Sequence, residues 1–345
     1  MSKSHPVSQD LIVWFSKAQR DLPWRKTNDP YAIWLCEIMM QQTRIETGTR
    51  YWHAFLTRWP KVELLAAADE SEVLKAWQGL GYYSRARNLL KAARVVVAEH
   101  RGVFPSTAEA LRKLPGVGPY TAAAISSICF DEPVPAVDGN VIRVVSRIFD
   151  VSEPVDAPAG RKAIDHAATA LMPDMGCGDH NQAMMELGAV ICKPKNPLCQ
   201  ACPVRVHCAG FAAGSHFDRP VKGKRITVKA VEMPMVVLTD GHHVALVQRP
   251  QPGIWAGLWT FPLAEDVPEG LGKPNGQAAP PFTHILTHRR LQLSFALRRW
   301  EGPSEGGEGA EWRWLTWEEA AEQALPRAME KIWSDARKSA AKLYI

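Results

Sequence analysis

The spacing of apolar residues differs between two parts of this chain. Up to about Phe211, apolar residues recur at the three- and four-residue spacing of amphipathic helices, as at Val141, Val144, Val145 and Ile148. Further along, apolar residues gather in short runs of strand length. The pattern therefore predicts an all-α first part followed by an α+β last part.

Local signals place several elements in the first part. Asp29 followed by Pro30 is typical of an N-cap and first helical residue, and predicts a helix through roughly Thr43. Ser106-x-x-Glu109 has the form of a capping box before a short helix. The segment Ala212–Arg225 is polar and basic, and we interpret it as a linker.

Turn and strand signals dominate the last part. Met235–Thr239 and Val244–Arg249 flank Asp240-Gly241, which predicts a β-hairpin. Leu291–Trp300 is a further strand candidate, and Thr316-x-x-Glu319 predicts the cap of a late helix. The stretch from 265 to 281 is rich in Gly and Pro, so we expect a loop there.

Length and charge narrow the class of protein. A chain of 345 residues is expected to form two domains or more. The net charge is +5, and it divides into +6 over residues 1–228 and −1 over the remainder. The first part is therefore the expected partner of a polyanion. The sequence has no apolar run long enough to span a membrane and no signal-peptide stretch, and its seven cysteines, an odd number, favour the reducing cytoplasm.

Four of those cysteines form a dense array. Cys192, Cys199, Cys202 and Cys208 are separated by six, two and five residues. Unequal gaps suit four thiolates on one cubane cluster, in which each sulfur takes a different iron. A zinc site and four buried structural cysteines are the alternatives.

The stretch LPGVGPYT (114–121) lies between two predicted helices and has the form of a helix-hairpin-helix. Gly116 and Gly118 would let the backbone approach a phosphate, and the following helix would present free N–H groups to it. An ordinary glycine turn between packed helices is the alternative.

Two carboxylates are predicted to titrate differently. Glu37 shares an apolar helix face with Ile33 and Met40, so we expect a raised pKa, unless the residue pairs with Arg44. Asp138 precedes a helix, where its ionised form is favoured, although a plain N-cap explains it equally well. One neutral and one charged carboxyl is the arrangement that cleaves glycosidic bonds.

These features together resemble the helix-hairpin-helix DNA glycosylase superfamily, specifically the MutY-type adenine DNA glycosylases. The resemblance covers nearly the whole chain and rests on these motifs: LPWR (22–25), WLCEIMMQQTR (34–44), QGLGYYSRARNL (78–89), LPGVGPYTAAA (114–124), VDGNVIRV (137–144), NQAMMELGAVIC (181–192) and the cysteine array. It implies removal of adenine mispaired with 8-oxoguanine in double-stranded DNA, and a [4Fe-4S] cluster held by the four cysteines.

The resemblance also assigns roles to single residues. Glu37 matches the general acid, and Asp138 matches the carboxylate that stabilises the sugar cation or traps it covalently, with Tyr120 and Asn140 in support. The residues matching DNA or base contacts are Arg25, Gln42, Thr43, Leu80, Tyr82, Gly116, Gly118 and Gln182. Bifunctional relatives carry a lysine at the position of Tyr120, so we expect base excision without an efficient lyase step.

The last part resembles the MutT-like (Nudix-fold) domain that reads 8-oxoguanine in this family. Thr287 and His288 match the reading loop, although Leu286 and Thr287 depart from the usual Phe-Ser-His. After Phe261 the chain has no Arg-Glu-x-x-Glu-Glu metal motif, so we expect recognition without nucleotide hydrolysis. The expected domains are a cluster lobe (1–28 with 136–211), a six-helix lobe (29–135), a linker (212–228) and a MutT-like domain (229–345).

Two rival functions stay open on the sequence. One is a glycosylase of the same superfamily with another base specificity, and the other is a non-catalytic iron–sulfur DNA-binding redox sensor. The expected protein is a cytoplasmic monomer that binds double-stranded DNA and no membrane.

Overall fold

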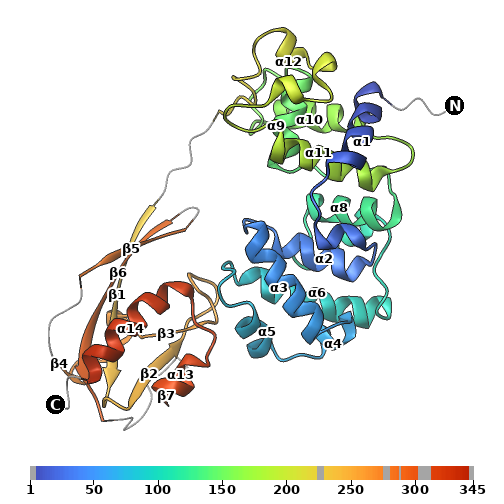
Figure 1. The fold of residues 1–345 in the computed structure, drawn as a ribbon. Helices are drawn as coiled ribbons and strands as arrows, with labels where there is room; N and C mark the ends of the chain where they lie inside the picture. Colours follow the sequence, from blue (N-terminus) through green and yellow to red (C-terminus); the bar gives the residue numbers. More distant parts are fainter. Residues whose placement is uncertain (1–4, 224–228, 275–279, 287–288, 302–311, 342–345) are drawn as a thin grey trace. The chain divides into compact units, whose positions relative to one another are not determined.

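The computed structural model describes residues 5–223, 229–274, 280–286, 289–301 and 312–341 (Figure 1). The chain forms two compact units. The first joins the residues up to Ala67 with Asn88–Arg225, and the second joins Ala68–Arg87 with the residues from Ile226 onward. The expected boundary between two helical lobes, at about residue 135, lies within the first unit. That boundary therefore stays a prediction.

The expected all-α first part is confirmed. Its helices in chain order are α1 (Pro6–Ala18), η1 (Pro23–Lys26), α2 (Pro30–Met39), α3 (Ile45–Arg58), α4 (Val62–Ala66), α5 (Glu70–Ala76), α6 (Ser84–His100), α7 (Ala108–Leu111), α8 (Pro119–Phe130), α9 (Gly139–Ile148), α10 (Pro158–Ala170), α11 (Cys177–Val190), η2 (Cys199–Ala201), η3 (Arg205–His207) and α12 (Ala209–Ala212).

Two predicted helix limits need correction. The Asp29 side chain caps α2 by accepting from the Tyr31 N–H, as expected, but the helix ends at Met39 and not at Thr43. Gln42 has a φ of 57°, and this left-handed conformation does not continue a helix. The cap of α7 is the Thr107 side chain and not Ser106.

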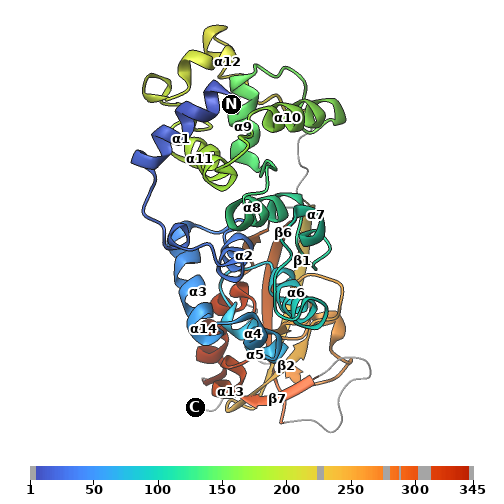
Figure 2. The same ribbon diagram turned by 90° about the vertical axis from the view of Figure 1, so that its right-hand side faces the viewer.

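The helices that position the candidate site pack directly on one another. Helix α8 contacts both α2 and α11, and α11 contacts α9 and α1 (Figure 2). The close approach of α11 to α9 depends on a small residue at the contact. A Cβ added at Gly188 of α11 would lie 2.6 Å from the Cβ of Asn140, so only glycine lets α11 pack this tightly on α9.

The segment expected to be a linker packs against the first unit through residue 223. The Val155 N–H donates to the Val221 carbonyl at 3.0 Å, and the Gly223 N–H donates to the Asp156 carboxylate at 2.8 Å. His216 is buried.

In the described residues from Lys229 onward, the second unit contains one mixed sheet with the helices α13 and α14, which confirms the expected change of class. Its elements after the helical segment are β1 (Lys229–Thr239), β2 (His243–Gln248), β3 (Trp259–Thr260), η4 (Ala264–Asp266), β4 (Lys273–Pro274), β5 (Phe282–Ile285), β6 (Arg289–Arg299), β7 (Trp312–Thr316), α13 (Trp317–Ala321) and α14 (Arg327–Ala341).

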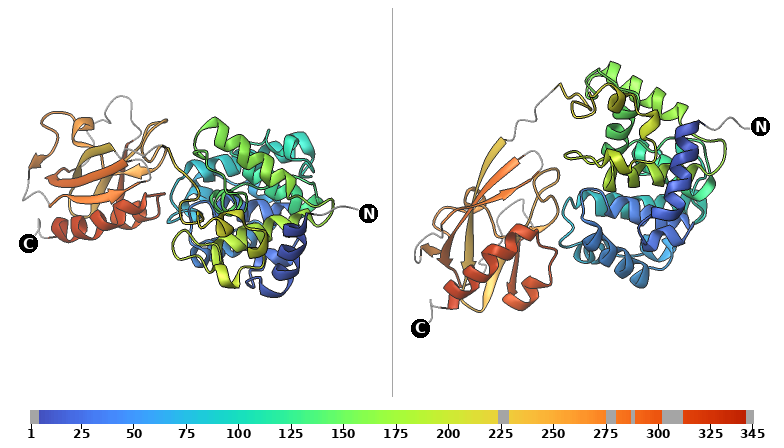
Figure 3. Two further views of the ribbon diagram at one scale, coloured as in Figure 1. Left: turned by 90° about the horizontal axis from the view of Figure 1, so that it is seen from above. Right: turned by 45° about the horizontal axis from the view of Figure 1, so that its top comes forward.

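Sheet order follows β3-β2-β1-β6-β4, with β5 paired to β6 and β7 paired to β2. The predicted hairpin is present, since β1 and β2 are antiparallel with Thr239 opposite Val244. Strands β1 and β6 run parallel in register over their full lengths. Helix α14 lies along one face of the sheet (Figure 3), and the Trp333 ring stacks on Phe261 at 5.4 Å.

The predicted capping box at the start of α13 is also present. The Thr316 hydroxyl accepts from the Glu319 N–H, and the Glu319 carboxylate accepts from the Thr316 N–H. Among the described helices, none is long and apolar enough to cross a lipid bilayer.

Candidate active site

Glu37 lies in the second half of α2, on a helix whose other residues are nearly all buried. Although part of the residue reaches the surface, burial of its carboxyl raises the pKa of Glu37 to about 7, the hydrogen bond with Tyr120 opposes that rise, and the negative charge of Asp138 adds to it. The alternative pairing with Arg44 is not present in the described structure, where Arg44 is exposed at the start of α3. Glu37 therefore exchanges its proton close to neutral pH.

Tyr120 is the second residue of α8, directly after Pro119, and lies next to Glu37. Its hydroxyl is 3.1 Å from the Met185 sulfur on α11. Burial raises the pKa of Tyr120 well above its usual value, and the charges of Glu37 and Asp138 raise it further. The hydroxyl is thus a permanent donor that contacts the acid from one side.

Asp138 is the N-cap of α9, and its carboxylate is held at both oxygens. The Val141 N–H donates to Oδ1 at 2.7 Å, and the Asn140 side-chain amide donates to Oδ2 at 2.9 Å. Arg143 fixes the orientation of that amide by donating to Asn140 Oδ1 at 2.9 Å. These donors hold both oxygens of the Asp138 carboxylate in fixed positions.

Arg143 also connects α9 to the segment that carries the first cysteine of the array. Its guanidinium donates to the Cys192 carbonyl and to the Gly188 carbonyl, each at 2.8 Å. A continuous set of hydrogen bonds therefore runs from the Cys192 backbone through Arg143 and Asn140 to Asp138.

A buried ion-pair cluster holds the segment before α2. Glu186 on α11 has a fully buried side chain, and it accepts from Arg20 at 2.7 Å and from Arg25 at 2.9 Å. Burial alone would raise the pKa of Glu186, but the hydrogen bonds from the two guanidinium groups outweigh it and lower the pKa to about 2. Arg25 is therefore anchored to α11 at Glu186, which lies one helical turn after Gln182.

The two glycines of the hairpin have different tasks. Gly116 has a φ of 75°, and a Cβ added there would lie 2.7 Å from the Asn88 Cβ, so a side chain is excluded. Gly118 is the N-cap of α8, and an added Cβ would contact nothing within 4 Å. There is thus open space on the side of Gly118 where a side chain would stand, directly before α8.

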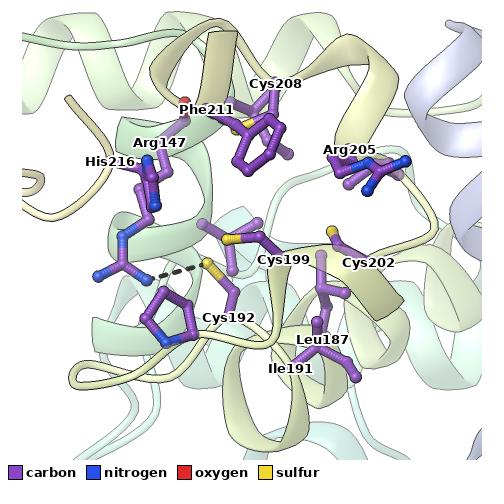
Figure 4. A pocket seen from close by; sticks show the side chains of 14 residues that line it. Arg147, Leu187, Ile191, Cys192, Cys199, Cys202, Arg205, Cys208, Phe211 and His216 are labelled. Carbon is purple, nitrogen blue, oxygen red and sulfur yellow. Dashed lines mark hydrogen bonds between the residues drawn. The ribbon is translucent and has the colours of Figure 1, made fainter. Parts of the chain in front are cut away.

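The four cysteines of the array line one cavity of about 30 Å³ (Figure 4). Burial raises the pKa of Cys199, Cys202 and Cys208, that of Cys202 to about 11. Within the described residues, no three His, Cys, Asp or Glu side chains converge closely enough to hold a single metal ion. The sulfurs surround a space and do not meet at a point.

Other predicted contact residues are placed as follows. Gln42 is exposed, Thr43 and Gln182 are partly buried, and none of the three belongs to the acid pair. Leu80 and Tyr82 belong to the second unit, where Leu80 is buried and Tyr82 is 45% exposed with a φ of 49°. Thr287 and His288 lie outside the described residues.

Comparison with known proteins places these features in a family. Residues 35–164 match the model of the HhH-GPD superfamily of base excision DNA repair proteins, and residues 234–335 match the NUDIX domain. The chain is 34% identical to the adenine DNA glycosylase of Mus musculus, with 94% of this chain and 76% of that protein covered. It is 40% identical to the adenine DNA glycosylase of Mycolicibacterium smegmatis, over 64% of this chain and 78% of that protein. The chain belongs to the adenine DNA glycosylase family.

Solved structures agree with this glycosylase assignment. A thermostable thymine-DNA glycosylase superposes with a TM-score of 0.55 at 31% identity, covering 60% of this chain and 95% of the other. Endonuclease III in a non-covalent DNA complex superposes with a TM-score of 0.51 at 22% identity, covering 60% and 94%, and shows the shared fold. The expected MutY-type membership and fold are thus confirmed.

Several residues of this glycosylase that bear on the site were missed from the sequence. Met185 and Glu186 on α11, and Arg143 and Arg147 on α9, all contact predicted site residues or their neighbours. A usable signal exists for the arginines. They follow Asn140 at three and seven residues, so they lie on one face of a helix whose remaining positions are mostly apolar.

Proposed function

We propose that this chain hydrolyses the N-glycosidic bond of adenine mispaired with 8-oxoguanine or guanine in double-stranded DNA, without cutting the strand. One observation carries the proposal. A carboxyl with a pKa near 7, Glu37, lies close enough to the doubly hydrogen-bonded carboxylate of Asp138 to sense its charge. This is the acid and anion pairing that glycosidic cleavage requires.

Glu37 supplies the proton in the first step. With a pKa of about 7, a large fraction of Glu37 is protonated at neutral pH. The proton passes from Glu37 to N7 of adenine, and the electron pair of the C1′–N9 bond leaves with the base. Protonation is needed because an adenine anion is a poor leaving group.

Asp138 acts on the sugar side of the same bond. As C1′ loses its bonding pair it acquires positive charge, and the Asp138 carboxylate faces that charge. Asn140 and the Val141 N–H hold the carboxylate at fixed positions, so little reorganisation is needed when the charge appears. Water then adds at C1′ and gives a proton to the Glu37 carboxylate, which leaves an abasic site and restores the acid.

The base must leave the helix before these groups can reach it. We assign Arg25 and Gln182 to the pocket for the extruded adenine, because both are carried by the elements that Glu186 ties together. Gly116, Gly118 and the start of α8 are assigned to a backbone phosphate. Gln42, Thr43, Leu80 and Tyr82 are assigned to the gap left by the base, with the exposed Tyr82 ring as the wedge.

Strand cutting is not expected, because it requires an amine that forms a Schiff base with the opened sugar. The position that holds lysine in bifunctional relatives is Tyr120, whose hydroxyl cannot form this bond. Purified protein should leave abasic sites that break only after alkali treatment. Strand breaks that appear without alkali at the rate of base loss would contradict this part of the proposal.

We assign recognition of 8-oxoguanine to the NUDIX-type domain. Between Phe261 and Lys273 the described chain forms only the three-residue helix η4, and Asp266 there pairs with Arg249 at 3.4 Å. The segment thus offers no glutamate-rich metal helix, which supports reading without hydrolysis. Deletion of residues 229–345 should abolish the preference for 8-oxoguanine over guanine, and an unchanged preference would refute the assignment.

We assign a [4Fe-4S] cluster to Cys192, Cys199, Cys202 and Cys208. The donor set fits, because four sulfurs spread around a cavity suit a cubane in which each binds a different iron. One zinc ion would need all four about 2.3 Å from a single point. The cluster would hold this loop in shape. Purified protein should contain iron and acid-labile sulfide in equal amounts, and zinc in their place would contradict the assignment.

Single-turnover excision on three duplexes tests the whole proposal. Adenine opposite 8-oxoguanine should be removed fastest, adenine opposite guanine more slowly, and adenine opposite thymine negligibly. Preference for thymine or an oxidised pyrimidine would favour the rival specificity. DNA binding without any excision would favour the rival redox sensor.

A further inference from the structure

Arg147 is a buried cation at the cysteine cavity. It is 3% exposed and lies on α9, one turn after Arg143. Its guanidinium donates to the Lys193 carbonyl at 2.8 Å, to the Arg219 carbonyl at 3.2 Å and to the Cys192 sulfur at 3.3 Å. In the part of the chain that the structure describes, no carboxylate pairs with it.

An unpaired buried charge is costly, so a counter-charge is expected beside it. The neutral carbonyls around Arg147 satisfy its N–H groups but bring no negative charge. Thiolate sulfurs do, and one of the guanidinium nitrogens already points at Cys192 Sγ (Figure 4). The charge of Arg147 therefore matches a cavity whose sulfurs are ionised by a bound metal centre.

His216 provides a second, independent sign of a missing acceptor. It lines the same cavity and is 8% exposed, and its Nδ1 is buried with no hydrogen-bond partner in the described structure. Its ring is held by Phe211 at 5.5 Å and Phe217 at 4.2 Å, so it cannot turn freely to find solvent. Buried polar atoms are normally hydrogen-bonded. Since Nδ1 of His216 has no such partner and lies beside four cysteines, we expect its acceptor to lie within the cavity.

We propose that Arg147 and His216 donate N–H hydrogen bonds to the sulfur atoms of the bound centre and raise its reduction potential. The inference rests on the [4Fe-4S] cluster assigned above. Donors and positive charge stabilise the more reduced, more negative state of a cluster. The two residues would thereby make loss of one electron from the resting cluster harder, which protects it against oxidation.

Arg205 gives a matched comparison within the same cavity. It also lines the cavity and carries the same charge, but its guanidinium binds the Gln200 side chain and lies over the Phe211 ring. Among the described residues it makes no hydrogen bond to a cysteine sulfur, unlike Arg147. In Figure 4 it lies beside Cys202, away from Arg147 and His216. If hydrogen bonds to sulfur set the potential, the substitution Arg205→Gln should have much the smaller effect.

The test uses the full chain and measures the cluster directly. Arg147→Gln, Arg147→Lys, His216→Phe and the control Arg205→Gln are assayed for iron, sulfide, visible absorption and midpoint potential at an electrode. At the wild-type midpoint, His216→Phe and Arg147→Gln should each raise the ratio of oxidised to reduced cluster by about tenfold, which is ~59 mV for one electron. Arg147→Lys should fall between Arg147→Gln and the wild type.

The outcomes separate this inference from the proposals on which it rests. Clusters that assemble in His216→Phe and Arg147→Lys with the wild-type midpoint would overturn it and leave the cluster intact. Absence of iron from the wild-type protein would overturn both this inference and the cofactor assignment. The proposed function would then still be tested separately, by the adenine-excision assay. If Arg147→Gln does not fold, His216→Phe decides, because an apolar ring of similar size preserves the packing against Phe211.

Discussion

The side-chain amide of Asn140 donates to the carboxylate of Asp138 at 2.9 Å, and this contact orients the anion of the site. The amide cannot turn over, because its own oxygen accepts from Arg143 at 2.9 Å. Arg143 in turn is anchored on the backbone carbonyls of Gly188, in α11, and of Cys192, just after it. The direction of one hydrogen bond at Asp138 is thus set by the packing of α9 on α11.

Replacement of Asn140 tests this relationship. Asn140→Leu removes the donor, and a hydrogen bond to a charged group contributes ~1.5–3 kcal/mol, so single-turnover excision should fall by about 10–100-fold. Asn140→Asp places a second carboxylate beside the first and should cost more. DNA affinity, measured by fluorescence anisotropy, should change little. An unaltered excision rate in both variants would show that Asn140 does not support the action of Asp138.

Tyr120→Phe should shift the pH dependence of excision. The hydrogen bond from Tyr120 lowers the pKa of Glu37, so its loss raises that pKa further above its usual value. Because the protonated acid is the active form, the rate declines as pH rises through the pKa. The decline should therefore begin at higher pH in the variant, and the ratio of the rates at pH 8 and pH 6 should increase severalfold.

Tyr31→Phe is the matched control for that measurement. Tyr31 lies on the same helix as Glu37 and also has a buried hydroxyl, which donates to the Trp59 carbonyl at 2.7 Å. Its loss should lower stability without moving the pH profile. Equal shifts in both variants would mean that the profile reports general destabilisation and not the acid.

Glu186→Gln should destabilise the protein by about 3–5 kcal/mol, since it leaves two guanidinium groups beside a buried neutral side chain. The folded-state pKa of Glu186, about 2, lies below the unfolded value. Its stabilising contribution is therefore complete above about pH 4.5 and disappears as pH falls towards 2. Denaturant unfolding should show a wide gap between wild type and variant at pH 7 and almost none near pH 2.

Asp21→Asn is the control for the ion-pair cluster. Asp21 pairs with Lys26 at 2.7 Å in the same segment, but both side chains are more than half exposed. Such a pair contributes at most about 1 kcal/mol, and salt screens it. A loss as large as that of Glu186→Gln would show that the segment is sensitive to any change of charge.

The local settings of Glu37 and Asp138 could be predicted because nearby sequence determines them. Asp29 and Pro30 start α2, and the apolar spacing after them places Glu37 among buried residues. Asp138 precedes the amphipathic run that forms α9. That Glu37 and Asp138 lie close together could not be predicted from the sequence. Their proximity depends on how α8 and α11 pack between α2 and α9, which are about a hundred residues apart in the chain.

Helix ends were harder to predict than helix starts. The residues after Met39 favour a helix by composition, yet Gln42 takes a left-handed conformation that costs on the order of 1 kcal/mol for a non-glycine residue. The cap of α7 moved by one residue, since Thr107 and not Ser106 accepts from the Ala110 N–H.

The contacts of the polar segment after residue 211 could not be predicted from its composition. Its composition predicts a linker, but Ser215 donates to Asp150 and Arg219 pairs with Asp150 at 2.9 Å. Buried arginines are likewise hidden from a pattern of hydrophobic residues, because Arg147 reads as a solvent-facing charge until its acceptors are known. Long-range polar contacts are the part of this structure that sequence periodicity does not encode.

The most direct test of the account compares wild type and Glu37→Gln in single-turnover excision of adenine opposite 8-oxoguanine from pH 5.5 to pH 9. The account predicts a wild-type rate that declines above about pH 7, where Glu37 loses its proton. Glu37→Gln should lower the rate on the order of 10²-fold or more below pH 7, where wild-type Glu37 holds its proton, and the difference should narrow as the pH rises above 7. A variant that excises adenine at nearly the wild-type rate would contradict the central claim.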